Sequence, residues 1–334
     1  MHSNGPNRCL PGRRRARPDP AGMLGASGAR AVAPLLPALA GAVLIAVGCG
    51  EGNFVVSNDS YEPRIVIEGF LQPGTGAHRI QIWRNFPPDA DMVGMDLVPD
   101  DTRATIVDEQ TGADHDLTFH GGPTLADNYF EYTGDDLVIE HGNSYTLDVR
   151  ATIEGEALHA WATTTVPQPG FRIVGVNHEQ LAYRPVNAAG EIVNFEFTIE
   201  RDPGTRLYLA KMRPAPGVAD TANFVYDNPY VERDPEDVLE DLADFSYSYD
   251  WIQNVPPGPG QSTFELFWFF FWFYGEHEIT IYAADPNYQR FLQTFDDVQE
   301  DDGNFHEADF AVEGDGIGVF GSVVVDRVTI EVVR

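Results

Sequence analysis

The chain has 334 residues, of which 52 are acidic and 21 basic, so its formal net charge at pH 7 is −31. A surface this acidic repels nucleic acid and anionic lipid headgroups, and we expect neither as a partner. The length is ample for two domains of ordinary size.

Residues 1–48 have the layout of a secretory signal peptide. Five arginines between residues 13 and 30 precede residues 31–48, which carry no charge. The stretch ends in Ile45-Ala46-Val47-Gly48 before Cys49, which resembles the lipobox of bacterial lipoproteins. We predict cleavage before Cys49 and lipidation there, with diacylglycerol and palmitate. Met23 alone begins a signal of normal length, so a start at that residue stays open.

A transmembrane signal anchor is the alternative for this segment. Its 18 uncharged residues are close to the length of about 20 that a spanning helix requires. Pro34 and Pro37 interrupt the segment, however, and its many alanines and glycines make it only mildly hydrophobic. We therefore favour the lipoprotein.

Lipidation of Cys49 would leave the mature protein without a free thiol. The other cysteine, Cys9, leaves with the leader, which excludes disulfides, thiol catalysis and cysteine zinc sites. The leader also removes six arginines and Asp19, so the net charge becomes −36. We attribute this acidity to solubility in a saline habitat rather than to cation binding. Residues 49–60 form a lipidated tether that reaches at most about 35 Å.

From residue 61 the pattern is typical of β-structure. Short apolar or alternating runs are separated by Gly, Asp, Asn and Pro, and about seven of them at this spacing predict a β-sandwich over residues 61–168. The expected strands are residues 64–69, 78–83, 104–108, 116–120, 129–132, 144–151 and 157–166.

Residues 167–170 (PQPG) break the pattern and are the expected domain boundary. A second β-rich domain should occupy residues 169–334, with strands at 171–176, 193–200, 206–212, 318–325 and 327–333. Two short helices should begin at Asp234-Pro235 and Asp285-Pro286, because each pair supplies an N-cap and a proline at the first helical position. The fold class is therefore all-β with little helix.

The most unusual segment is residues 264–274 (FELFWFFFWFY), which is too short for a membrane helix. One interpretation is a central strand buried on both faces. The other is an aromatic binding surface for a protein, a membrane interface or a sugar, for which we name Trp251, Trp268, Trp272 and Tyr274 as candidate binding residues.

Acidic residues crowd positions 296–309, and calcium prefers such oxygen-rich loops. The spacing fails the EF-hand test, because Val298 falls at the first ligand position when Asp302-Gly303 is in register. We expect a solvated loop, and neither a metal site nor a cofactor.

Enzyme motifs are missing from the sequence. It contains no G-x-S-x-G, H-E-x-x-H or P-loop pattern, and its three His-Glu pairs lack the second histidine of a helical zinc site. We expect a non-enzyme. A hydrolase with a carboxylate pair stays open, because sequence spacing does not fix spatial separation.

Four stretches resemble a family of lipoproteins known mainly from Bacteroidetes, domain of unknown function 4249. They are Cys49 with residues 64–69; residues 103–108 with 129–132 and 142–147; residues 279–282 with Asp285, Tyr288 and Phe291; and residues 314–322 (GDGIGVFGS). Asp315 departs from the pattern, since members often carry glycine there.

The resemblance implies an outer-membrane lipoprotein with an N-terminal immunoglobulin-like β-sandwich and a second β-rich domain. It also implies a non-enzymatic binding or assembly role, accessory to a TonB-dependent transporter. The aromatic residues between 226 and 274 suggest an alternative function, a glycan- or peptide-binding module. Whether the protein faces the periplasm or the cell surface stays open.

Overall fold

The structure is a computed structural model that describes residues 61–87, 90, 97–99, 101–124, 127–229, 234, 249–254, 257–298 and 308–334. The chain divides into two compact units, Met1–Asn58 and Asp59–Arg334, and the described residues all lie in the second. The predicted leader, Cys49 and the tether lie outside them, so these predictions stand on the sequence alone.

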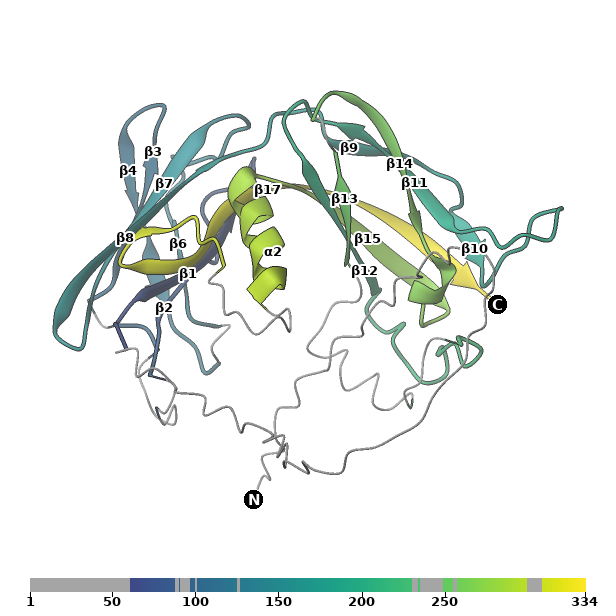
Figure 1. The fold of residues 1–334 in the computed structure, drawn as a ribbon, viewed down its shortest axis with the longest axis horizontal. Coiled ribbons are helices and arrows are strands. Elements are labelled where there is room, and N and C mark those ends of the chain that lie inside the picture. The colour runs from purple at the N-terminus through teal and green to yellow at the C-terminus, as the bar shows by residue number, and fades with distance from the viewer. Residues whose placement is uncertain are drawn as a thin grey trace, which may run out of the picture. The chain divides into compact units, whose positions relative to one another are not determined.

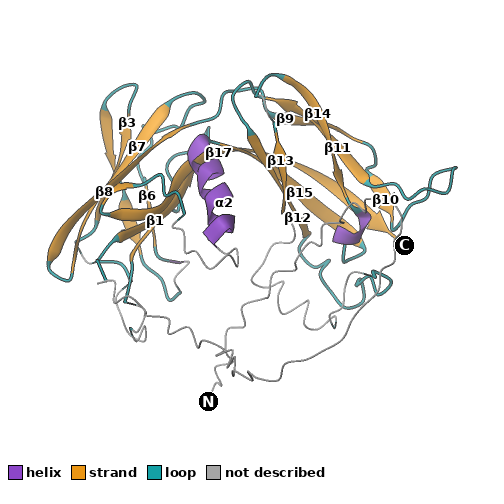
Figure 2. Cartoon of the chain, in the orientation of Figure 1, coloured by secondary structure: helices purple, strands orange, loops and turns teal. Residues whose placement is uncertain are grey.

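Strands are the main regular structure of the described chain (Figures 1 and 2). The strands before residue 170 are β1 Ile65–Leu71, β2 Gln81–Arg84, β3 Arg103–Asp108, β4 Ala113–Asp116, β5 Thr118–His120, β6 Tyr129–Glu131, β7 Ser144–Ile153 and β8 Glu156–Thr165. They follow the seven predicted runs closely, except that residues 116–120 are divided between β4 and β5.

The later strands are β9 Arg172–Val176, β10 Gln180–Ala182, β11 Phe195–Arg201, β12 Leu207–Pro214, β13 Tyr249–Gln253, β14 Gly260–Leu266, β15 Gly275–Ala284, β16 Glu313–Gly314 and β17 Gly316–Val333. The expectation of an all-β chain with little helix is confirmed. One α-helix, α2 (Pro286–Val298), is present in the described residues, where Asp285-Pro286 predicted it. The helix predicted at Asp234-Pro235 falls outside them.

Four sheets organise these strands. The largest has the order β13-β12-β15-β17-β1-β2, with β10 also paired to β17. The others are β16-β8-β7-β3-β4, β14-β11-β9 and the β5-β6 hairpin. Most neighbours are antiparallel, but β1 and β10 both run parallel to β17.

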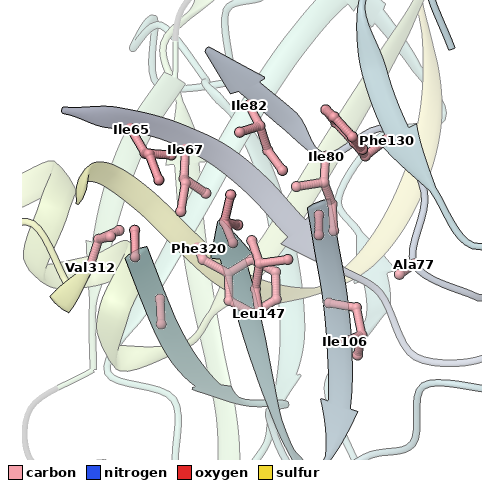
Figure 3. Packing of buried hydrophobic residues seen from close by; sticks show 14 of the residues in the cluster. Ile65, Ile67, Ala77, Ile80, Ile82, Ile106, Phe130, Leu147, Val312 and Phe320 are labelled. Atoms are coloured by element: carbon pink, nitrogen blue, oxygen red, sulfur yellow. The ribbon is translucent and has the colours of Figure 1, made fainter. Parts of the chain in front are cut away.

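The first hydrophobic core lies between β1, β2 and β6 on one side and β3, β7 and β8 on the other. Side chains alternate along these strands, as in β1, where Ile65, Ile67 and Leu71 are buried and Glu68 is exposed. Figure 3 shows Ile65 and Ile67 in this core with Phe320, which comes from the far end of the chain. The core therefore contains residues from both sides of the predicted boundary at residue 168.

The second core is enclosed by β11 and β14 on one side and by β12, β15 and β17 on the other. Phe195 and Phe197 of β11 are fully buried, as are Ile279 and Ile281 of β15. Ile330, near the end of β17, completes the cluster. Strand β17 thus supplies side chains to both cores.

The prediction of two C-terminal strands is wrong, because β17 is continuous over 18 residues. The expected break lay at Asp326, a residue type common in turns. In the structure its carboxylate accepts hydrogen bonds from the backbone N–H groups of Ile173 (2.6 Å) and Arg327 (2.8 Å). Asp326 therefore links β17 to β9 and does not interrupt the strand.

Candidate functional site

The aromatic segment 264–274 is not a single strand, so its interpretation as one central buried strand is wrong. Strand β14 ends at Leu266, and a 3₁₀ helix, Trp268–Phe270, follows at once. The Phe270 N–H donates to the Phe267 carbonyl at 3.0 Å, which closes a turn instead of a sheet ladder. Phe273 then forms an isolated bridge with Phe224, and β15 begins at Gly275.

Because the backbone turns, the aromatic rings divide between interior and surface. Phe271 and Phe273 are fully buried, and Trp268 is 8% exposed. Phe267 is 40% exposed. The segment therefore contributes to the core and to the surface at once.

Two of the four candidate binding residues lie together. Trp268 and Tyr274 both contact the ring of Tyr183 edge-on, with centroid distances of 5.4 and 6.0 Å. The guanidinium of Arg184 lies over Trp268 and that of Arg334 over Tyr274, at 4.8 and 5.2 Å from the ring centroids. These arginine contacts cover part of the rings that a ligand would have to reach.

The other two candidates do not join this group. Trp272 packs beside Phe224 and Phe273 in a small separate cluster. Trp251 belongs to β13, but its side chain lies outside the described part of the structure. Tyr183, which brings Trp268 and Tyr274 together, carried no signal in the sequence. Burial raises the pKa of its hydroxyl far above the ordinary value, so it stays protonated.

Beside these rings lies a different set of aromatic side chains, which we call the aromatic ridge: the exposed Tyr226 and Phe267 and the half-buried Phe269. Tyr226 is 68% exposed. The rings of Phe267 and Phe269 are stacked, with centroids 5.3 Å apart and planes 6° from parallel. The loop that carries Tyr226 is attached to the segment by an Asn228 side-chain bond to the Phe269 carbonyl, at 2.8 Å. The ridge is therefore held on a fixed backbone.

A second group of polar residues is buried where β8, α2 and β17 meet, and we call it the polar junction: Thr164, Asp285 and Ser322. The Thr164 hydroxyl donates to Asp285 Oδ2 at 2.7 Å and lies 2.8 Å from Ser322 Oγ. The other carboxylate oxygen accepts the N–H of Tyr288 at 2.9 Å, so Asp285 caps the first turn of α2. Burial nevertheless raises the pKa of Asp285 above its ordinary value, and these hydrogen bonds limit the rise.

The polar junction explains why several residues of the family resemblance occur together. A Cβ at Gly321 would lie 2.8 Å from Asp285 Oδ1 and 3.2 Å from the Tyr288 Cβ. Gly318 has φ of +111° and its backbone meets the Ile67 carbonyl so closely that no side chain fits. These motif residues hold β1, α2 and β17 together, which is a structural role.

The described residues offer little for metal or membrane chemistry. Within the ranges given above, no three His, Cys, Asp or Glu side chains are grouped so that they could hold a metal ion. Most of the acidic loop 296–309 lies outside those ranges, so the expectation about calcium stays a prediction. No helix among the described residues has the length and apolar character needed to cross a bilayer.

Comparison with known proteins identifies the family. Residues 53–327 match the model of the family described as domain of unknown function (DUF4249), so the chain belongs to that family. No curated protein matches the chain. Among solved structures, a DUF4785 family protein from Legionella pneumophila subsp. pneumophila str. Philadelphia 1 is similar, with 14% identity and a TM-score of 0.23. The match covers 64% of this chain and 51% of that one, so the chain spans about half of its length.

Proposed function

We propose that this family member is a lipid-anchored outer-membrane lipoprotein with a non-enzymatic binding or assembly role, accessory to a TonB-dependent transporter. The lipobox before Cys49 supports the anchor. The tether of about 35 Å at most would keep the folded part near the bilayer, which favours membrane-bound partners. Protease treatment of intact cells distinguishes the two faces, because only a surface protein is digested.

The aromatic ridge is the observation that supports a protein partner. Tyr226 and Phe267 expose large rings on a chain of net charge −31, where acidic side chains would be the default. Aromatic residues are enriched in protein interfaces, and truncating them often costs about 2 kcal/mol or more of binding energy. A ridge fixed by backbone contacts loses little conformational entropy when it binds.

Site-specific photocrosslinking in the native cells tests this function. A photoreactive residue at position 267 should crosslink to an outer-membrane transporter, identified by mass spectrometry. The double substitution Tyr226→Ser and Phe267→Ser should remove most of the complex that is recovered by chemical crosslinking. Phe119→Ser is the matched control, because Phe119 is 45% exposed but lies on β5. Absence of any membrane-protein adduct, or equal losses in both variants, would contradict the proposal.

A glycan- or peptide-binding module is the second candidate, and the same ridge favours it. This function requires aromatic rings that a ligand can reach. Phe267 meets that requirement, because its ring is 40% exposed and is stacked on the ring of Phe269. Tryptophan and tyrosine fluorescence titration with oligosaccharides and short peptides would detect it. A saturable change that Phe267→Ser abolishes supports the module, and an unchanged spectrum counts against it.

We also propose that the first core belongs to an immunoglobulin-like sandwich. Its support is that two sheets with mainly antiparallel neighbours enclose Ile65, Ile67 and Leu147. An experimental structure whose strand order differs from that of immunoglobulin domains would refute this assignment.

A further inference from the structure

A cavity of about 660 Å³ lies at the opposite end of β14 from the aromatic ridge. We call it the arginine pocket, and four parts of the chain line it: the end of β8, the turn between β11 and β12, Pro257, and the start of α2 with the two residues before it. The volume lies within the range of about 300–1,000 Å³ that is typical of small-ligand sites. The side chains used below are those of Thr205, Arg206, Gln289, Arg290, Gln293 and Gln168.

The two acidic residues in the lining already have internal partners. The carboxylate of Asp202, which is fully buried, accepts the N–H groups of Gly204 and Thr205 at 2.9 Å and the Tyr208 hydroxyl at 3.0 Å. Asp285 is engaged by Thr164 and the first turn of α2, as described above. Neither carboxylate needs a ligand to satisfy it.

Several hydrogen-bond donors in the lining lack such partners. Thr205 is only 4% exposed, yet its hydroxyl has no hydrogen-bond partner among the described residues. A buried hydroxyl without a partner costs about 1–3 kcal/mol, but this oxygen is enclosed by protein, so a ligand in the pocket does not reach it. Among the described residues, the Arg206 guanidinium also forms no hydrogen bond and no ion pair. Arg290 makes one half-exposed contact of 3.6 Å with Asp309.

Charge also distinguishes the arginine pocket from the rest of the chain. Two arginines and two aspartates line it, so it is formally neutral on a chain of net charge −31. The guanidinium of Arg206 can donate two parallel hydrogen bonds, and a carboxylate is the acceptor with that geometry. An anion would therefore meet less repulsion here than over the acidic average of the surface.

The remaining lining narrows the ligand class. Three glutamine side chains, at positions 168, 289 and 293, offer both donors and acceptors, which suits the amide groups of a peptide backbone. Val166, Pro167 and Pro257 supply apolar walls. Among the described residues, no aromatic side chain lines the pocket, so these residues offer a sugar ring or nucleobase no ring to stack against.

We propose that the arginine pocket binds the carboxylate end of a short peptide, with Arg206 donating to the carboxylate and the glutamines to the backbone. This site shares no residue with the aromatic ridge, so the peptide proposal does not depend on the proposed transporter partner.

Isothermal titration calorimetry of the purified protein with tetra-alanine tests the site. Tetra-alanine with a free carboxylate should bind at least about tenfold more tightly than its C-terminal amide, because charge-assisted hydrogen bonds are lost in the amide. Equal affinities for the two peptides, equal affinity for succinate, or no heat up to about 10 mM peptide would overturn the proposal.

Matched variants separate the site from general charge effects. Arg206→Ala should weaken tetra-alanine binding at least about tenfold, and Arg206→Lys should restore only part of it. Arg172→Ala makes the same charge change at an exposed ion pair with Glu200 and should change affinity by less than about twofold. Thr205→Val should raise the melting temperature of the free protein and change tetra-alanine affinity by less than about twofold, because the Thr205 hydroxyl is enclosed and does not face the ligand. An equal loss of tetra-alanine affinity in Arg206→Ala and Arg172→Ala would refute the role of Arg206 in binding the carboxylate.

Discussion

Replacing Thr164 by valine should show how much the polar junction contributes to stability. The substitution keeps the branched shape and removes the hydroxyl that donates to Asp285 Oδ2 at 2.7 Å. A buried hydrogen bond to a charged group contributes about 1.5–3 kcal/mol. We expect the free energy of unfolding to fall by about 2 kcal/mol, which corresponds to about 4 °C in melting temperature for a unit of this size.

The loss should also depend on pH. Burial raises the pKa of Asp285, and the Thr164 hydroxyl opposes that rise by stabilising the ionised form. Without the hydroxyl the folded pKa rises further, so the deficit is greatest at pH 7. It should shrink as the pH falls through the folded pKa toward the ordinary value of 3.8, where the carboxyl is protonated.

Urea unfolding followed by tryptophan fluorescence at pH 7 and pH 4 measures both effects. The matched control is Thr163→Val on the same strand, because the Thr163 hydroxyl is exposed and its one hydrogen bond within the described residues is to the Thr146 hydroxyl, at 2.7 Å. The control should change stability by less than about 0.5 kcal/mol. If both variants lose the same stability, or if the deficit of Thr164→Val does not shrink at pH 4, the reasoning about the polar junction is refuted.

Three further measurements follow from the structure. Gly318→Ala should lower the free energy of unfolding by about 3 kcal/mol or prevent folding, because φ is +111° and the new Cβ would collide with the Ile67 carbonyl. Gly175 lies in open space, so Gly175→Ala should lower the free energy of unfolding, measured with urea, by less than about 1 kcal/mol. Burial lowers the pKa of His277 from 6.5 to about 4, so the stability that depends on its neutral form is fully present above pH 6.5. Relative to His277→Gln, the free energy of unfolding of the wild type should fall by about 3 kcal/mol between pH 6.5 and pH 4. Cys49→Ala should abolish incorporation of radiolabelled palmitate and release the protein from membranes, and retained label would contradict the predicted anchor.

Local patterns predicted most of the individual strands, because burial on one face imposes a period of two. In β7, Tyr145, Leu147 and Val149 are buried and alternate with polar residues, and the run was predicted from that pattern. The helix α2 was predicted from Asp285-Pro286 because capping is also a local interaction.

Long-range features were not predictable in this way. The aromatic run carries no alternation, so nothing in it marks the turn after Leu266. The continuity of β17 depends on Asp326 accepting the Ile173 N–H from a strand about 150 residues earlier. The arginine pocket is assembled from four separated segments, and neither Arg206 nor Thr205 belongs to a motif.

The pairing of β17 with β1 has a consequence for the order in which the chain can fold. Gly316–Ser322 pairs with Ile65–Leu71, and the second half of the same strand pairs with β15. Neither core can therefore be completed until the residues of β17 are available, and early intermediates would expose unpaired strand edges. A chaperone that shields the chain until its C-terminus arrives would consequently matter more for this protein than for one whose sandwich closes on contiguous residues.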